Sequence, residues 1–162
     1  NDKIKIFNLA VSNFSGNSFL YFHKDADGNN DERYIQGATL RKEKDNISEN
    51  KKIEVKAINI SEILNSFKKI DLIKIDIEGS EYDVIRDLFG TGAIDLINKF
   101  YVEFHDVKLH TNMQDEEKKL KKMITEKFGM NCFFRFVEGN FRMFKQAHPD
   151  LDENMYNNIG PL

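Results

Sequence analysis

Acidic side chains and a histidine lie at the ends of two predicted strands, and these residue types bind cations or move protons. Asp76 lies near the end of the apolar stretch 71–77, and Glu78 follows it directly. Glu103 and His105 close the next predicted strand along the chain. Open α/β sheets bind ligands at the carboxyl ends of their strands, and neighbouring strands lie about 4.8 Å apart. We therefore expect these four side chains, together with Glu81 of the same acidic stretch, to meet in one site that holds a divalent ion, supplies a general base or attracts a cationic ligand.

A purely structural interpretation of the same residues stays open. Glu81 is expected only to favour the first turn of its helix, and Glu103 can simply pair with a lysine. Ser80 with Asp83 three residues later resembles a capping pair, so a short, firmly held turn is predicted before that helix.

The elements that must position this cluster follow from hydrophobic periodicity and turn residues. Strands are predicted at residues 4–11, 18–23 (antiparallel), 53–58, 71–77 and 97–104; helices at 61–69, 81–89 and 114–128; and a hairpin at 130–137 and 141–144. Alternating strands and helices followed by a hairpin predict an α/β fold, with a Rossmann-like, mostly parallel sheet and an antiparallel carboxyl-terminal hairpin. In the helices, Phe67 and Val84, Ile85, Leu88 and Phe89 are expected to face inward.

The chain length of 162 residues predicts a single domain over residues 1–162. Within it, residues 24–52 are predicted to be a polar loop or insertion. Its acidic stretch 25–32 resembles a calcium loop only weakly, because the glycine is at the fourth position instead of the sixth. A solvated loop is the better interpretation of that stretch.

The composition of the chain argues against several classes of function. Net charge is −3, from 24 basic and 27 acidic residues, so nucleic-acid binding is not expected, and the basic run 118–122 reads as a solvated helix face. No apolar run approaches the ~20 residues of a membrane span. The single cysteine, Cys132, precludes an internal disulfide and favours a reducing, cytoplasmic location. No serine stands in a nucleophile-elbow context, so covalent catalysis has little support.

Four stretches resemble the FkbM-type S-adenosylmethionine-dependent methyltransferases. They are LAVS at 9–12, VKAINISEIL at 55–64, IDLIKIDIEGSE at 70–81 and YVEFH at 101–105. The resemblance implies a class I methyltransferase fold, S-adenosylmethionine as cofactor, and transfer to a hydroxyl of a sugar or other small metabolite. Ser61 departs from the family's usual Asp, which we expect to affect only helix capping. The family's first strands have no counterpart here, so we expect the chain to be truncated at its amino terminus.

Site roles follow from this resemblance. Asp76, Glu103 and His105 are the expected catalytic residues, with Glu103 or His105 as the base that deprotonates the acceptor. Ser12, Asp76 and Glu78 are the expected cofactor-binding residues, with Asp76 at the junction of cofactor and acceptor. The expected partner is a small-molecule or glycan acceptor, and a homo-oligomer is compatible with the sequence.

Two other functions stay open on the same residues. One is a metal-dependent hydrolase or nuclease with Asp76, Glu78 and Glu103 as ligands. The other is a non-catalytic, methyltransferase-like module that binds a partner through an exposed sheet edge. The carboxylate cluster disfavours the second, since a scaffold does not need those charges.

Overall fold

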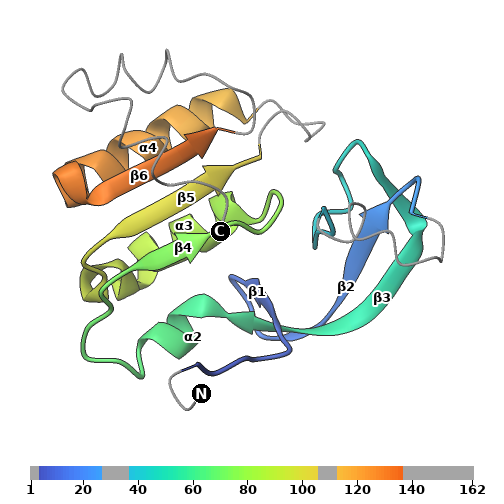
Figure 1. Ribbon diagram of the computed structural model, residues 1–162, viewed down its shortest axis with the longest axis horizontal. Coiled ribbons are helices and arrows are strands. Elements are labelled where there is room, and N and C mark those ends of the chain that lie inside the picture. Colours follow the sequence, from blue (N-terminus) through green and yellow to red (C-terminus); the bar gives the residue numbers. More distant parts are fainter. Residues whose placement is uncertain (1–3, 27–36, 106–112, 137–162) are drawn as a thin grey trace.

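The computed structural model describes residues 4–26, 37–105 and 113–136, which contain two three-stranded sheets (Figure 1). The first sheet has the order β1-β3-β2, in which β1 (Ala10–Ser12) is parallel and β2 (Gly16–His23) antiparallel to β3 (Ile47–Asn59). The second sheet, β4-β5-β6, is parallel throughout and consists of β4 (Ile73–Ile75), β5 (Phe100–Phe104) and β6 (Cys132–Phe136). The described residues therefore form a mixed α/β structure, and the antiparallel pairing predicted for the second strand is confirmed.

Two helices cover the parallel sheet. The helices α3 (Glu81–Thr91) and α4 (Gln114–Phe128) pack on β5 and on each other, and Figure 1 shows both behind the three strands. Shorter helical segments complete the described chain: α2 (Ile60–Leu64), η1 (Ala93–Leu96) and η3 (Gly129–Asn131). Among the described residues, no helix has both the length and the apolar character that crossing a membrane requires.

The core lies between α3, α4 and the parallel sheet, where apolar side chains spaced three and four residues apart meet the alternating residues of β5. Its fully buried members include Val84, Ile85, Leu88, Phe100, Val102 and Ile124. The inward face predicted for α3 is thus confirmed. The helix ends at Gly92, whose φ of 77° is a left-handed conformation that costs glycine little.

Several predicted elements are shorter than expected. The predicted strands 71–77 and 97–104 are reduced to Ile73–Ile75 and Phe100–Phe104. Only Ala10 and Val11 of the predicted strand 4–11 pair with β3, and Ile6 is 91% exposed. The predicted helix 61–69 ends at Leu64, and Phe67, expected inside, is 53% exposed. The reason is local: the carbonyl of Ile63 accepts the Ser66 hydroxyl, and the Phe67 N–H turns to Leu64, three residues back.

Two further predictions concern the polar segment and the hairpin. The strand β3 begins at Ile47, so the last six residues of the predicted loop 24–52 are strand residues, of which Ile47 and Lys52 pair with β2. Residues 27–36 of that loop lie outside the described residues. Of the predicted carboxyl-terminal hairpin, β6 pairs with β5 and is parallel to it, while 141–144 lie outside the described residues.

Candidate active site at the carboxyl ends of β4 and β5

A tight turn follows β4 and leads directly into α3. Glu78 has φ 54° and Gly79 has φ 108°, so two consecutive residues occupy left-handed conformations. The carboxylate of Glu81 holds this turn, because its Oε1 accepts the N–H of Ile77 at 3.0 Å and its Oε2 accepts the N–H of Gly79 at 2.8 Å. Glu81 is completely buried. Its side chain is therefore a structural centre of the site, and the expectation that it only favours a helix start was wrong.

The predicted capping pair does not form. Ser80 is the N-cap residue of α3, but its side chain makes no capping hydrogen bond. Asp83 pairs instead with Arg41, at 2.7 Å between Oδ2 and Nη2, and with Arg86. The turn is held firmly, as predicted, but by Glu81 inside the protein and not by a hydroxyl at the helix end.

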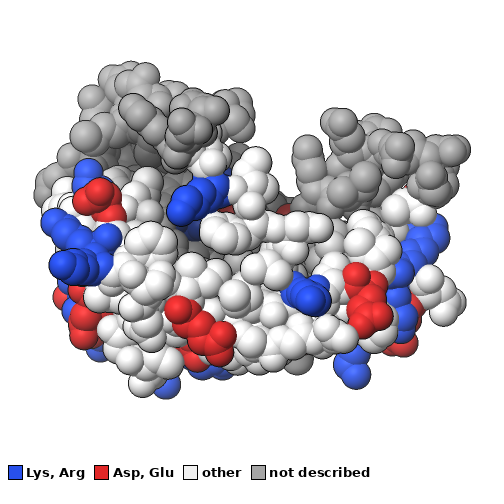
Figure 2. Space-filling model, turned by 90° about the horizontal axis from the view of Figure 1, so that it is seen from below, with Lys and Arg blue, Asp and Glu red and all other residues white. Residues whose placement is uncertain are grey.

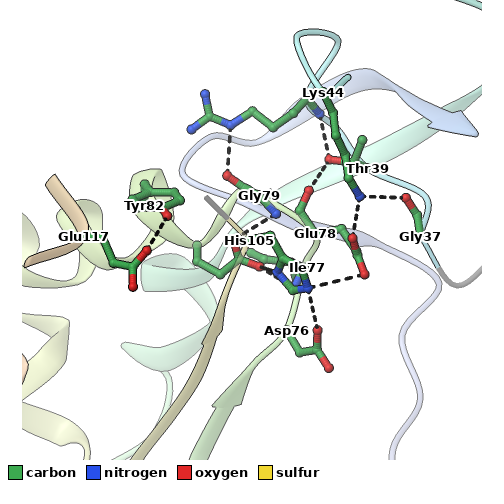
Figure 3. Close-up of polar contacts among 12 residues, drawn as sticks. Gly37, Thr39, Lys44, Asp76, Ile77, Glu78, Gly79, Tyr82, His105 and Glu117 are labelled. Carbon is green, nitrogen blue, oxygen red and sulfur yellow. Dashed lines mark hydrogen bonds and ion pairs between the residues drawn. The ribbon is translucent and has the colours of Figure 1, made fainter. Parts of the chain in front are cut away.

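His105 lies at the centre of the acidic cluster, just past the end of β5, and is 2% exposed (Figure 3). Its Nδ1 is 2.9 Å from Oε1 of Glu81. An ionised carboxylate only accepts hydrogen bonds, so we place the ring proton on Nδ1. On the other side of the ring, Nε2 is 3.4 Å from Oε1 of Glu78 and 3.9 Å from Oδ1 of Asp76. The structure thus brings Asp76, Glu78 and His105 together, as predicted.

The electrostatic surroundings of His105 favour its charged form. Burial disfavours the imidazolium, but the hydrogen bond to Glu81 and three nearby carboxylates outweigh that cost and raise the pKa of His105 above its ordinary value of 6.5. The three carboxylates belong to Glu81, Glu78 and Glu103. A protonated ring at this position offsets the mutual repulsion of the acids around it.

Glu103 is buried on β5 and close enough for its charge to act on His105. It does not belong to the tight group, however. Among the described residues, the group able to offer ligand atoms within 4.8 Å of one another is Asp76, Glu78 and His105. The set predicted for a metal site, with Glu103 as the third ligand, is therefore replaced by one with the histidine.

Side chains from the segment 37–44 also reach the site, which the sequence did not indicate. The Thr39 hydroxyl donates to the carbonyl of Glu78 at 2.7 Å, and Arg41 Nε donates to the carbonyl of Gly79 at 3.2 Å. Lys44 Nζ pairs with Oε2 of Glu78. Single polar residues in a segment without periodicity carry no local signal of such contacts, and the residues they hold are 34 to 39 positions away.

A cleft of about 610 Å³ lies between the first sheet and the turn after β4. Val11 and Val55 line it on one side, and Asp76, Glu78 and Ser80 on the other. Ser12, the other expected cofactor-binding residue, is buried, and its hydroxyl lies 3.4 Å from Oδ1 of the neighbouring Asn13. Its neighbours on β1, not Ser12, are among the lining residues.

The parallel sheet and its covering helices define an α/β protein, and the acidic cluster at the carboxyl ends of its strands is a candidate ligand site. The chain belongs to the Methyltransferase FkbM domain family, whose model matches residues 1–143. No curated protein and no solved structure matches it. Members of this family use S-adenosylmethionine, and the chain is an S-adenosylmethionine-dependent methyltransferase.

The residues present fit this cofactor. S-adenosylmethionine has a cationic sulfonium, a cationic amino group and ribose hydroxyls, and all of these favour carboxylate neighbours. Asp76 and Glu78 present carboxylates to a cleft whose volume lies within the ordinary range for small-molecule sites.

Proposed function

We propose that the protein transfers a methyl group to a hydroxyl of a sugar or another small metabolite, and that cofactor and acceptor meet at the carboxylates of Asp76 and Glu78. The observation that carries this proposal is the convergence of Asp76 and Glu78, which line one cleft, on the buried ring of His105. Basic and acidic side chains are interspersed on the face drawn in Figure 2, which favours a small acceptor over a polyanion.

Bound S-adenosylmethionine supplies a methyl group on a good leaving group, so the protein mainly has to align the acceptor and accept a proton. Alignment can supply roughly 7–11 kcal/mol of the barrier. Asp76 is suited to this role because its side chain lines the cleft while its Oδ1 lies 3.9 Å from the ring of His105. Glu78 forms the adjacent part of the same wall and is held in place by its neighbours.

The acceptor proton is assigned to Nε2 of neutral His105. Glu81 fixes Nδ1–H, which leaves the lone pair of Nε2 facing Asp76 and Glu78 when the ring is neutral. A positioned base of this kind contributes about 10²–10⁴-fold in rate. Glu103, the other expected base, lies outside the tight group and acts in this proposal through its charge on the histidine.

We also propose a Rossmann-like fold and a cytoplasmic location for the protein. The parallel order β4-β5-β6 with helices on it supports a Rossmann-like arrangement in which the two sheets belong to one cofactor-binding domain. The single buried thiol of Cys132 supports a reducing, cytoplasmic location.

Calorimetric titration with S-adenosylhomocysteine tests the site. Asp76→Asn is expected to weaken binding about tenfold or more, because it removes a charge that faces the cofactor. Asp71→Asn is the matched control, since Asp71 is exposed and lies five residues earlier at the other end of β4. Equal affinity of the Asp76 variant and the unaltered protein contradicts the placement of the cofactor.

Divalent-ion binding is a second candidate property, since Asp76, Glu78 and His105 form a group of suitable geometry. We expect methyl transfer to survive EDTA, because the buried ammonium of Lys44 already supplies positive charge to the Glu78 carboxylate. Activity lost in EDTA and restored by Mg²⁺ or Mn²⁺ contradicts this expectation and favours a metal-dependent reaction.

A further inference from the structure

Lys44 is a buried lysine beside the proposed site, and its environment is unusual for that residue type. Its side chain is 0% exposed, and its Nζ pairs with Oε2 of Glu78 and donates to the carbonyl of Gly37 at 3.1 Å. An ammonium group is costly to bury unless it is paired and hydrogen-bonded. The partner that compensates this burial is a residue of the cleft wall.

Glu78 is held from two sides as a result. One carboxylate oxygen, Oε2, meets Lys44, and the other, Oε1, lies 3.4 Å from Nε2 of His105 (Figure 3). The lysine therefore decides which oxygen of Glu78 is presented to the histidine. We expect a change at Lys44 to alter the orientation of that carboxylate.

The backbone of Glu78 also depends on the segment that carries Lys44. A φ of 54° is uncommon for a residue with a side chain and persists only where the surroundings enforce it. Thr39 Oγ1 bonds the Glu78 carbonyl at 2.7 Å, and Arg41 Nε bonds the next carbonyl at 3.2 Å. The segment 37–44 thus fixes both the main chain and the side chain of one residue.

We propose that Lys44 is a positioning residue of the methyltransferase site, which acts on the cofactor and the acceptor through Glu78. The proposal depends on the proposed function, because it requires that Glu78 belong to the cofactor–acceptor cleft. A simple ion pair on the surface is the alternative, and the complete burial of Lys44 and the place of Glu78 in the cleft wall argue against it.

The test is a double-mutant cycle with Lys44→Met, Glu78→Gln and the combined variant. Binding of S-adenosylhomocysteine by the folded protein is measured by calorimetry. We expect Lys44→Met and Glu78→Gln each to weaken binding about tenfold or more, the scale typical for loss of an outer-shell partner. The combined variant should match Glu78→Gln alone within about twofold, because the lysine acts only through that residue.

Two further variants separate positioning from structure. Lys42→Met is the matched control, since Lys42 is exposed in the same segment, and it should leave affinity unchanged. Lys44→Arg keeps the charge and should restore most of the affinity lost in Lys44→Met. If Lys44→Met does not fold, the combined variant and Lys44→Arg carry the test, because the first removes both charges of the pair and the second keeps both.

The outcomes are distinguishable. Additive losses in the combined variant, or unchanged affinity in Lys44→Met while Glu78→Gln is impaired, overturn the role of Lys44 alone. Unchanged affinity in Glu78→Gln shows that Glu78 does not contact the cofactor. That result contradicts both the proposed place of Glu78 in the cofactor site and the role of Lys44. A lower content of folded protein with unchanged affinity per folded molecule marks a merely structural role and also overturns the inference.

Discussion

At the scale of single residues, the site is organised around one buried carboxylate. Glu81 accepts two backbone N–H groups and the Nδ1–H of His105, so one side chain fixes the turn after β4 and the tautomer of the ring. A carboxylate that orients a histidine is also the arrangement by which a catalytic imidazole is held in other enzymes. A substitution of Glu81 should therefore affect both the turn and the histidine, and not only the first turn of the helix.

Glu81→Gln is expected to destabilise the protein by about 1–3 kcal/mol, because an amide cannot accept all three hydrogen bonds and leaves a buried donor unsatisfied. It should also lower the pKa of His105, since the hydrogen bond and charge of Glu81 raise it. Denaturant unfolding measures the first effect, and NMR titration of the ring the second. Glu126→Gln, on the exposed face of α4, is the control and should change neither quantity. An unchanged ring pKa in the Glu81 variant contradicts the orienting role.

The raised pKa of His105 also predicts how stability depends on pH. The folded protein binds this proton more tightly than the unfolded chain, so the contribution is fully present below pH 6.5. It is lost as pH rises through the higher folded pKa. The melting temperature should therefore fall over that interval, and the fall should be smaller in His105→Gln. His23→Gln, outside the cluster, should keep the full dependence. The same deprotonation should increase the rate of transfer as pH rises.

At the scale of elements, β4, its turn and α3 form the unit that carries Asp76, Glu78 and Glu81, while His105 directly follows β5. The helix has one fully buried face, with Val84, Ile85 and Leu88 at 0% exposure. Because Glu81 begins this helix, the position of its carboxylate depends on the packing of that face. A substitution that leaves a cavity behind α3 should therefore disturb the position of the Glu81 carboxylate as well as the packing of the core.

Leu88→Ala is expected to destabilise the protein by about 2–5 kcal/mol, since it removes buried methyl groups and leaves a cavity. Leu72→Ala, at a position that is 57% exposed just before β4, should stay within about 0.5 kcal/mol of the unaltered protein. Both changes in unfolding free energy are measured from the midpoints of denaturant unfolding, provided that the dependence of the free energy on denaturant concentration is the same in all variants. Equal midpoints for the two variants contradict the assignment of the core.

At the scale of the whole molecule, the cleft lies between the first sheet and the turn that follows β4 of the second sheet. Residues of β1 and β3 line it on one side and residues after β4 on the other, while Thr39, Arg41 and Lys44 bridge to the turn. A ligand bound there contacts both sheets and should stabilise the molecule as a unit. S-adenosylhomocysteine at 100 times its Kd is expected to add about 2.7 kcal/mol to the free energy of unfolding.

Thermal unfolding with and without the ligand measures this effect, and Asp76→Asn should reduce it at the same ligand concentration. Hydrogen exchange gives a second measurement, with protection expected both in β3 and in the turn after β4. Protection confined to one of the two sheets contradicts a site in the cleft between them.

The sequence by itself determined the elements of the parallel half, their buried faces and the acidic cluster. Helical spacing predicted the inward face of α3 and the full extent of α4, and the residues after β4 and β5 predicted that Asp76, Glu78 and His105 meet. These predictions succeed because periodicity and strand ends are local features, and parallel pairing then brings the ends together.

Only the tertiary structure decided what holds that cluster in place. Lys44 and Thr39 meet Glu78 across 34 and 39 residues, and Glu81 turns inward to meet a histidine 24 residues away. Such contacts depend on how separate segments pack, because a lysine in a polar stretch or a glutamate in a first helical turn looks the same whether it faces solvent or a buried partner. Burial and charge pairing over long sequence distances are properties of the folded chain, and no local pattern encodes them.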